Sequence, residues 1–223
     1  LTPDRGMVCN GGFTSGGKVL LGCHAHGYIN NVEEAIAQSC NNYFVTAWLE
    51  NINRFGSETP VKGIDAFNDY LSQFGLGQKL GIDFPGEISG FIPGSEFINK
   101  SEKGERWKAI YYRALAIGQG QYEMTSLQIA NFIAAIANRG HWFTPHLIRQ
   151  VQEGNDAVTR PLTPDRHDID IDRQHFEPVV RRMRPTVLHG TDRRPYIPHV
   201  EIFGKTGPSQ KPHGAAHSRS PAF

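Results

Sequence analysis

Residues 35–44 read Ala-Ile-Ala-Gln-Ser-Cys-Asn-Asn-Tyr-Phe, and this stretch interrupts an apolar helical pattern with a short polar cluster. Between 31 and 51, apolar residues recur at helical spacing on both sides of the interruption. The pattern therefore predicts one helix before the break and one after it. Ser39 and Asn41 at such a break can present a hydroxyl and an amide to one cleft, although the same residue types more often cap helices.

Length, composition and charge indicate a globular protein. The chain has 223 residues, of which 39% are hydrophobic, enough to form a core and to exclude a disordered chain. Lys and Arg number 23 against 22 Asp and Glu, so the formal charge of +1 gives no reason to expect nucleic-acid binding. No apolar run is long enough to cross a membrane, and an opening at Leu1 without an initiator Met leads us to expect a longer chain.

Periodicity and turn residues predict the other elements. Glycine pairs at 11–12 and 16–17 separate short apolar runs and predict a hairpin-like loop over 1–27. Further along we expect an amphipathic helix at 64–74, a surface loop at 75–94, a buried central helix at 125–140, a strand at 143–151, a polar linker at 165–172 and a basic helix at 176–188. The last helix carries Arg181, Arg182 and Arg184, which we interpret as a solvated face.

Three cysteines, an odd number, permit two interpretations. Cys9 and Cys23 can pair as a disulfide, which leaves Cys40 as a small buried apolar residue. Alternatively, Cys9, Cys23, His26 and Cys40 form a tetrahedral zinc site, in which the Cys23-x-x-His26 spacing lets one turn present two ligands. The residues leave both interpretations open. Zinc would use every cysteine and would tie the hairpin-like loop to the polar cluster at 35–44.

Residues 199–207 alternate apolar and polar side chains at the period of a strand and end in Lys-Thr-Gly. Gly207 lets a ligand lie against the backbone, and Thr206 offers a hydroxyl. Lys205 supplies a positive charge for a carboxylate or for a proton relay. The pattern predicts an edge strand that a ligand can approach closely.

A Ser-x-Asn followed far downstream by Lys-Thr-Gly resembles the second and third motifs of the penicillin-recognising serine enzymes. Residues 81–87, 117–120 and 137–140 read Gly-Ile-Asp-Phe-Pro-Gly-Glu, Ile-Gly-Gln-Gly and Ala-Asn-Arg-Gly. Together with 35–44, these segments resemble the class B penicillin-binding proteins, and among them the penicillin-binding protein 2 type. The resemblance covers residues 9–217, nearly the whole chain.

This resemblance implies an α+β transpeptidase fold, with an antiparallel sheet packed between helices and an all-helical lobe. Residues 1–223 would form part of that domain. It also implies a serine-type D,D-transpeptidase that cross-links peptidoglycan stem peptides ending in D-Ala-D-Ala during cell elongation and is the target of β-lactams. Such an enzyme needs no catalytic cofactor, and it works with a SEDS-type glycosyltransferase at the periplasmic face of the inner membrane.

The resemblance also assigns roles to individual residues. Ser39 would relay a proton to the leaving nitrogen, and Asn41 would hold the substrate amide. Lys205 and Thr206, which precede Gly207, would bind the terminal carboxylate. No nucleophile is assigned within the chain.

The chain departs from the family in two places. The family's nucleophilic serine begins a Ser-x-x-Lys on a helix, but the only such motif before Ser39 is Ser15–Lys18, where two glycines disfavour a helix. We therefore expect the nucleophile, a membrane anchor and a non-catalytic module in a preceding part of the protein. Pro208 stands where the family has Ser or Thr, and proline lacks the N–H that forms half of the oxyanion hole.

These departures leave two alternatives open. One is a non-catalytic scaffold of the wall-synthesis machinery, and the other is a relative that senses or hydrolyses β-lactams.

Overall fold

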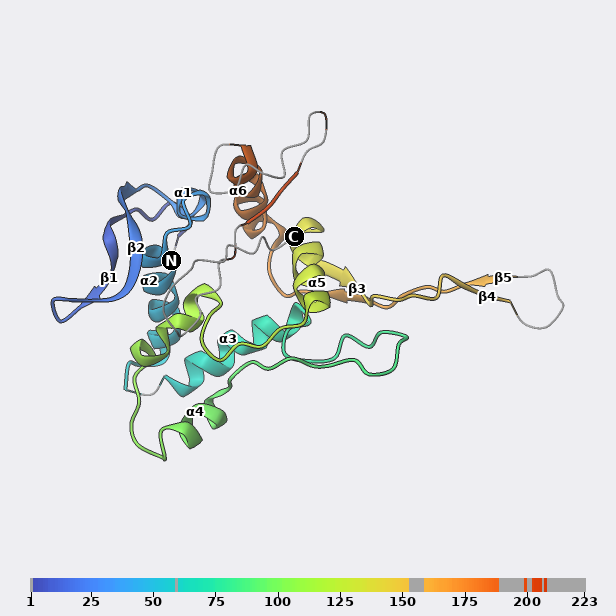
Figure 1. Ribbon diagram of the computed structural model, residues 1–223, viewed down its shortest axis with the longest axis horizontal. Coiled ribbons are helices and arrows are strands. Elements are labelled where there is room, and N and C mark those ends of the chain that lie inside the picture. The colour runs from blue at the N-terminus through green and yellow to red at the C-terminus, as the bar shows by residue number, and fades with distance from the viewer. Residues whose placement is uncertain are drawn as a thin grey trace, which may run out of the picture.

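The computed structural model describes residues 2–58, 60–152, 159–188, 199, 202–205 and 207. The described part has an α+β fold, in which helices accompany three two-stranded antiparallel sheets. Figure 1 shows the N-terminal hairpin at one end of the molecule and a two-stranded arm at the opposite end. None of the helices described is both long enough and apolar enough to cross a membrane.

The predicted hairpin is present as β1 (Met7–Ser15) and β2 (Lys18–Ile29), which pair in antiparallel fashion. Gly16 and Gly17 form its turn with φ angles of 56° and 74°, a region that glycine enters without strain. The register shifts directly after Cys9, and such a bulge re-aims the neighbouring side chains. The side chain of Cys9 is completely buried, so this end of the hairpin packs on the body of the molecule.

The two helices predicted around the polar cluster are confirmed as α1 (Val32–Ala37) and α2 (Asn41–Ile52). The side chain of Asn31 caps α1 by accepting a hydrogen bond from the backbone N–H of Glu34. Ser39 lies in the break between the helices with a φ of 55°, in the left-handed region.

A first core forms where α2 continues into η1 (Asn53–Phe55) and packs on α3 (Val61–Gln73). The helix predicted at 64–74 is thus confirmed and begins one turn earlier. Two further helices complete this core, α4 (Ser95–Ser101) and η2 (Ala109–Ile117). Its buried members are Trp48, Ile52, Ile64, Ile98, Trp107, Ala109, Tyr112 and Leu115.

A second core forms around α5 (Ser126–Ala137), which packs against Phe74 and Trp142. The prediction of a buried central helix is only partly right. Leu127 is 38% exposed, and among the buried residues of α5 are two polar ones, Gln128 and Asn131. Apolar side chains such as Leu127 can still lie at the surface of a folded protein, because burial depends on what packs against each face of the helix.

Gln128 holds the surface loop predicted at 75–94. Its Oε1 accepts a hydrogen bond from the N–H of Thr125 and completes a capping box at the start of α5. Its Nε2 donates to the carbonyls of Gly75, Gln78 and Ser89, 2.7 to 3.3 Å away. The loop therefore has an ordered path although it contains no long element.

The predictions for 143–151 and 165–172 need correction. The first stretch is a strand only at its ends, because Pro145 cannot donate to a ladder and Asp83 binds the N–H groups of Leu147 and Ile148. The second contains a strand and the buried Ile169 instead of a polar linker. The strands are β3 (His141–Phe143), β4 (Gln150–Gln152), β5 (Thr159–Pro161) and β6 (Arg166–Asp168), which pair as β3–β6 and β4–β5.

The basic helix is confirmed as α6 (Glu177–Leu188), which follows η3 (Arg173–His175). The prediction of a solvated face holds for Arg181, which is exposed although it forms an ion pair with Glu33 of α1, whereas the less exposed Arg182 packs closer to α1 and pairs with the same carboxylate. The side chain of Arg184 lies outside the described residues.

The strand predicted at 199–207 is not found in the residues described there, which are 199, 202–205 and 207. Strand geometry requires a hydrogen-bonded partner, and in the described part the segment is held instead by α6. Thr206 and Pro208 lie outside the described residues.

Candidate functional site

Ser39 owes its position to the end of α1. The helix closes with a hydrogen bond from the N–H of Ser39 to the carbonyl of Ile36, at 3.2 Å. A second bond runs from the N–H of Cys40 to the carbonyl of Ala35, at 3.0 Å. This closure resembles the αL ends of many helices, and it turns the chain so that consecutive side chains leave in different directions.

Lys205 reaches Ser39 from the other end of the chain. Its Nζ donates a hydrogen bond to Ser39 Oγ at 2.8 Å, although the two residues are 166 positions apart. Lys205 is partly buried, and burial lowers the pKa of its ammonium group from the usual range. A lysine with a lowered pKa next to a hydroxyl can pass a proton through that hydroxyl.

Asn41 contacts the hairpin. Its side-chain Nδ2 donates to the carbonyl of Gly22 at 2.9 Å, and its backbone N–H donates to the Sγ of Cys23 at 3.1 Å. The structure thus joins Ser39 with Lys205 and links Asn41 to β2. Gly207 is exposed, and Thr206, the remaining predicted residue, lies outside the described part.

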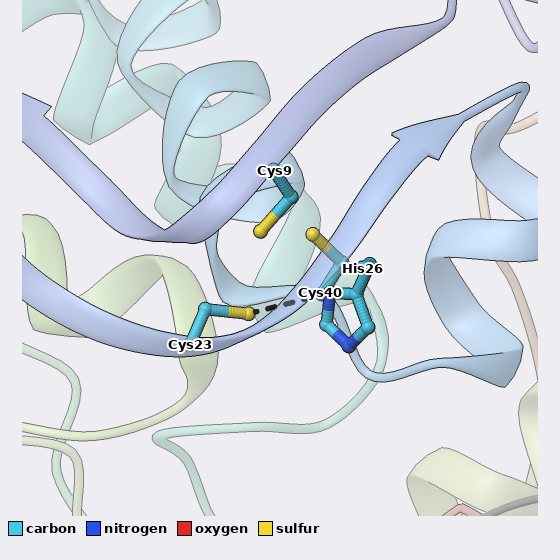
Figure 2. A group of neighbouring side chains, drawn as sticks. All are labelled: Cys9, Cys23, His26 and Cys40. Atoms are coloured by element: carbon cyan, nitrogen blue, oxygen red, sulfur yellow. Dashed lines mark hydrogen bonds between the residues drawn. The ribbon is translucent and has the colours of Figure 1, made fainter.

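The four predicted metal ligands converge on one point, as Figure 2 shows. Cys9 comes from β1, Cys23 and His26 come from β2, and Cys40 caps the N-terminus of α2. Their ligand atoms all lie within 4.8 Å of one another, and the three thiols are free. A tetrahedral zinc ion with bonds of about 2.0–2.3 Å needs ligand atoms roughly 3.5 Å apart, so a small contraction would complete such a site.

The environment of the four groups fits a cation. Burial raises the pKa of the Cys40 thiol to about 12, so without a positive charge this thiol stays protonated. At Cys9, burial also acts to raise the pKa, but hydrogen bonds from the Gly11 backbone and from the other two thiols outweigh it and lower the pKa. A bound zinc ion would hold all three sulfurs as thiolates. The N–H of Asn41 already donates to one of them, as groups around a metal site commonly do.

Sequence reasoning missed two contacts that support the site. Arg113 of η2 donates from Nε to the carbonyl of Leu20 at 2.9 Å and so fastens β2 to the body. Glu33 binds Arg181 and Arg182 of α6. Partners 93 and 149 positions apart leave no local signal in a sequence, because nothing in periodicity or spacing relates them.

The chain is similar to known proteins over most of its length. The family model described as penicillin binding protein transpeptidase domain matches residues 2–220. A peptidoglycan D,D-transpeptidase MrdA of Acinetobacter baumannii is 31% identical over 185 residues, which are 83% of this chain and 26% of that protein. The chain thus spans about a quarter of the length of this relative.

Two solved structures have the same fold. One is Pseudomonas aeruginosa PBP2 in complex with WCK 5153, with a TM-score of 0.74 and 26% identity over 94% of this chain and 46% of that one. The other, from a study of polymerization and crosslinking by a peptidoglycan synthase complex, has a TM-score of 0.71 and 25% identity. It covers 95% of this chain and 33% of that one. The α+β transpeptidase fold expected from the sequence is therefore confirmed.

Proposed function

Because this chain belongs to the penicillin-binding protein transpeptidase family, we propose that it supplies the Ser-x-Asn and Lys-Thr-Gly portion of a peptidoglycan D,D-transpeptidase. The proposed substrates are stem peptides ending in D-Ala-D-Ala, and β-lactams would acylate the same enzyme. The observation that carries the proposal is the hydrogen bond from Lys205 Nζ to Ser39 Oγ, which joins the two motifs across the molecule.

The proposed chemistry gives each residue one task. Lys205, whose pKa is lowered by burial, keeps Ser39 poised to pass a proton to the leaving nitrogen. Asn41 would hold the substrate amide once a substrate replaces its present partner, the carbonyl of Gly22. Thr206, together with Lys205, would bind the terminal carboxylate of the substrate.

The attacking serine is proposed to come from sequence outside residues 1–223. The Ser-x-x-Lys at Ser15–Lys18 spans the turn of the β1–β2 hairpin. A turn with two left-handed glycines does not present serine and lysine one helical turn apart, which the activated nucleophile requires.

We further propose a structural zinc ion held by Cys9, Cys23, His26 and Cys40, which fit a tetrahedral set of soft and borderline ligands. The ion would take no part in acyl transfer. It would tie the hairpin to the residue between Ser39 and Asn41. In keeping with the family, we propose that the protein works on the periplasmic side of the inner membrane with a membrane-bound glycosyltransferase, as the synthase complex among the matched structures suggests.

Labelling with a fluorescent penicillin tests the enzymatic proposal. The full-length product of the gene should be labelled at one serine, and residues 1–223 expressed alone should stay unlabelled, because acylation requires the nucleophile. Changing Lys205→Ala in the full-length protein should slow labelling at least about a hundredfold, as expected for a proton-transfer group.

Three outcomes would contradict the proposal. A full-length product that takes no label while it remains folded would favour the non-catalytic scaffold. Labelling of residues 1–223 would show that the nucleophile lies within them. Rapid release of the label, with turnover of the penicillin, would indicate a hydrolysing relative.

A further inference from the structure

Glu33, in the first turn of α1, joins two helices that hold the two halves of the candidate site. We propose that Glu33 is a positioning residue for the Ser39–Lys205 pair and acts through Arg181 and Arg182 of α6. The inference rests on the function proposed above and concerns the geometry of the same site.

The segment that carries Lys205 is fastened to α6. The N–H of Gly204 donates to the carbonyl of Met183 at 3.1 Å, one residue before Lys205. Met183 is 6% exposed and belongs to the core around α5, so its backbone has a fixed place. The position of Lys205 therefore follows the position of α6.

Glu33 fixes α6 against α1. One carboxylate oxygen of Glu33 lies 3.1 Å from a guanidinium nitrogen of Arg181, and the other lies 2.8 Å from Nε of Arg182. The side chain of Glu33 is 22% exposed, whereas that of Arg181 is 65% exposed. A single partly buried carboxylate that binds two arginines restricts the sliding of one helix over the other more than a single exposed pair does.

From Glu33 the connection returns to Ser39 through α1 itself. The N–H of Gln38 donates to the carbonyl of Glu34 at 2.9 Å, and that of Ser39 donates to the carbonyl of Ile36 at 3.2 Å. A closed ring of contacts results. It runs from Glu33 through α1 to Ser39, across to Lys205, and back through α6 to Glu33. Without Glu33, α6 keeps its packing in the core around α5 and its pair with Arg139, but it loses the charged contact that sets its register against α1.

Loss of Glu33 should change the geometry of the site more than it changes the stability of the fold. Ion pairs with exposed partners contribute about 0–1 kcal/mol to folding, so loss of Glu33 should leave the chain folded. A displacement of about 1 Å at a proton-transfer pair, in contrast, can cost up to about a hundredfold in rate.

The first test uses residues 1–223 and needs no catalysis. Lysines are acetylated under native conditions and their modification is followed by mass spectrometry. In the Glu33→Gln variant we expect Lys205 to react several-fold faster relative to the other lysines, with an unchanged melting temperature. The matched control is Glu177→Gln, which removes the part-exposed pair between Glu177 and Arg139 at the start of α6, 3.0 Å long, without touching α1. The control should leave the reactivity of Lys205 unchanged.

The second test uses the full-length product and a fluorescent penicillin. Glu33→Gln should slow acylation about tenfold without weakening the initial binding of the penicillin. The double variant Arg181→Gln with Arg182→Gln should show at least this defect, and adding Glu33→Gln to it should cost nothing more, because both ion pairs of Glu33 are already lost in the double variant.

The two tests separate the inference from the proposed function. If the full-length wild type is never acylated, the proposed function fails, and the acetylation pattern still decides on Glu33. Unchanged reactivity of Lys205 in Glu33→Gln would overturn the inference. A general rise in the reactivity of all lysines would also overturn it, because it would show a merely structural role.

Discussion

Three consecutive residues at the break between α1 and α2 bind three different parts of the molecule. Ser39 accepts a hydrogen bond from Lys205, Cys40 points into the thiol cluster, and Asn41 donates to the carbonyl of Gly22. The left-handed φ of Ser39 makes this divergence possible, because it turns the chain sharply at one residue. Any change in the backbone at Cys40 must therefore reach the side chains on both sides of it.

The burial of Lys205 predicts how stability depends on pH. Because burial lowers the pKa of Lys205 in the folded state, the unfolded chain binds more protons between the folded pKa and the ordinary value of 10.5. The destabilising effect of Lys205 is therefore greatest at neutral pH and fades as the pH rises toward 10.5. In the Lys205→Met variant this effect is removed, so the free energy of unfolding of the variant relative to the wild type should fall as the pH rises toward 10.5.

Urea unfolding of both proteins across this range measures the difference. Lys62→Met, which removes a lysine from an exposed position of α3, serves as the control. A constant difference for Lys205→Met would show that Lys205 titrates normally.

At the scale of the element, the sequence correctly predicted the helices and strands whose pattern depends on their own residues alone. The helices on both sides of residues 35–44 followed from apolar spacing, and the hairpin followed from its glycine pairs. The strand expected at 143–151 failed because one proline and one carboxylate from another loop, Asp83, redirect the backbone there. Burial of α5 was overestimated because composition does not say which faces find a partner.

The same distinction applies to the candidate site, where some residues could be identified from the sequence and others could not. The convergence of Cys9, Cys23, His26 and Cys40 could be predicted because the chain has only three cysteines, and the Cys-x-x-His spacing selects one of its ten histidines. The ties between Glu33 and α6 could not be predicted. Charged residues are common, and their pairing depends on how two helices pack.

The crossing of α2 and α3 provides a prediction at this scale. Gly63 lies in the interior of α3, where alanine would ordinarily favour the helix by about 1 kcal/mol. Here a Cβ at residue 63 would overlap the backbone carbonyl of Ile52, which cannot move without shifting α2. We therefore expect Gly63→Ala to destabilise the protein by about 1–3 kcal/mol, measured by urea unfolding.

Gly22→Ala is the matched control for this change, because a Cβ at that residue meets no atom within 4 Å. This variant should unfold close to the wild-type urea concentration. A Gly63→Ala protein as stable as the wild type would mean that α2 and α3 are less closely packed than the structure has them.

At the scale of the whole molecule, the candidate site lies on the smallest of the three cores that the described residues form. The cores around α2 and α5 contain tryptophan and several large aliphatic side chains, whereas the core under the hairpin consists of Cys9, Ile29, Ala35, Cys40 and Tyr43. Two of these five residues are cysteines. So little buried apolar area stabilises a hairpin weakly, and small cores of this kind commonly depend on a metal or a disulfide.

This dependence predicts the effect of removing zinc. The protein purified without chelator should contain about one equivalent of zinc. Removing it with 1,10-phenanthroline should speed hydrogen exchange in the hairpin and at residues 38–41, because metal-binding free energy is shared with the local fold. Exchange in α3 and α5 should stay the same, since those helices belong to the two larger cores.

Two variants provide a matched comparison. Cys23→Ser should behave like the metal-free protein. His24→Gln changes the histidine beside His26 but outside the cluster, and it should retain zinc. Less than about half an equivalent of zinc would exclude the metal. A disulfide between Cys9 and Cys23 found by mass spectrometry would also exclude it and would make that bond the tie between the two strands of the hairpin.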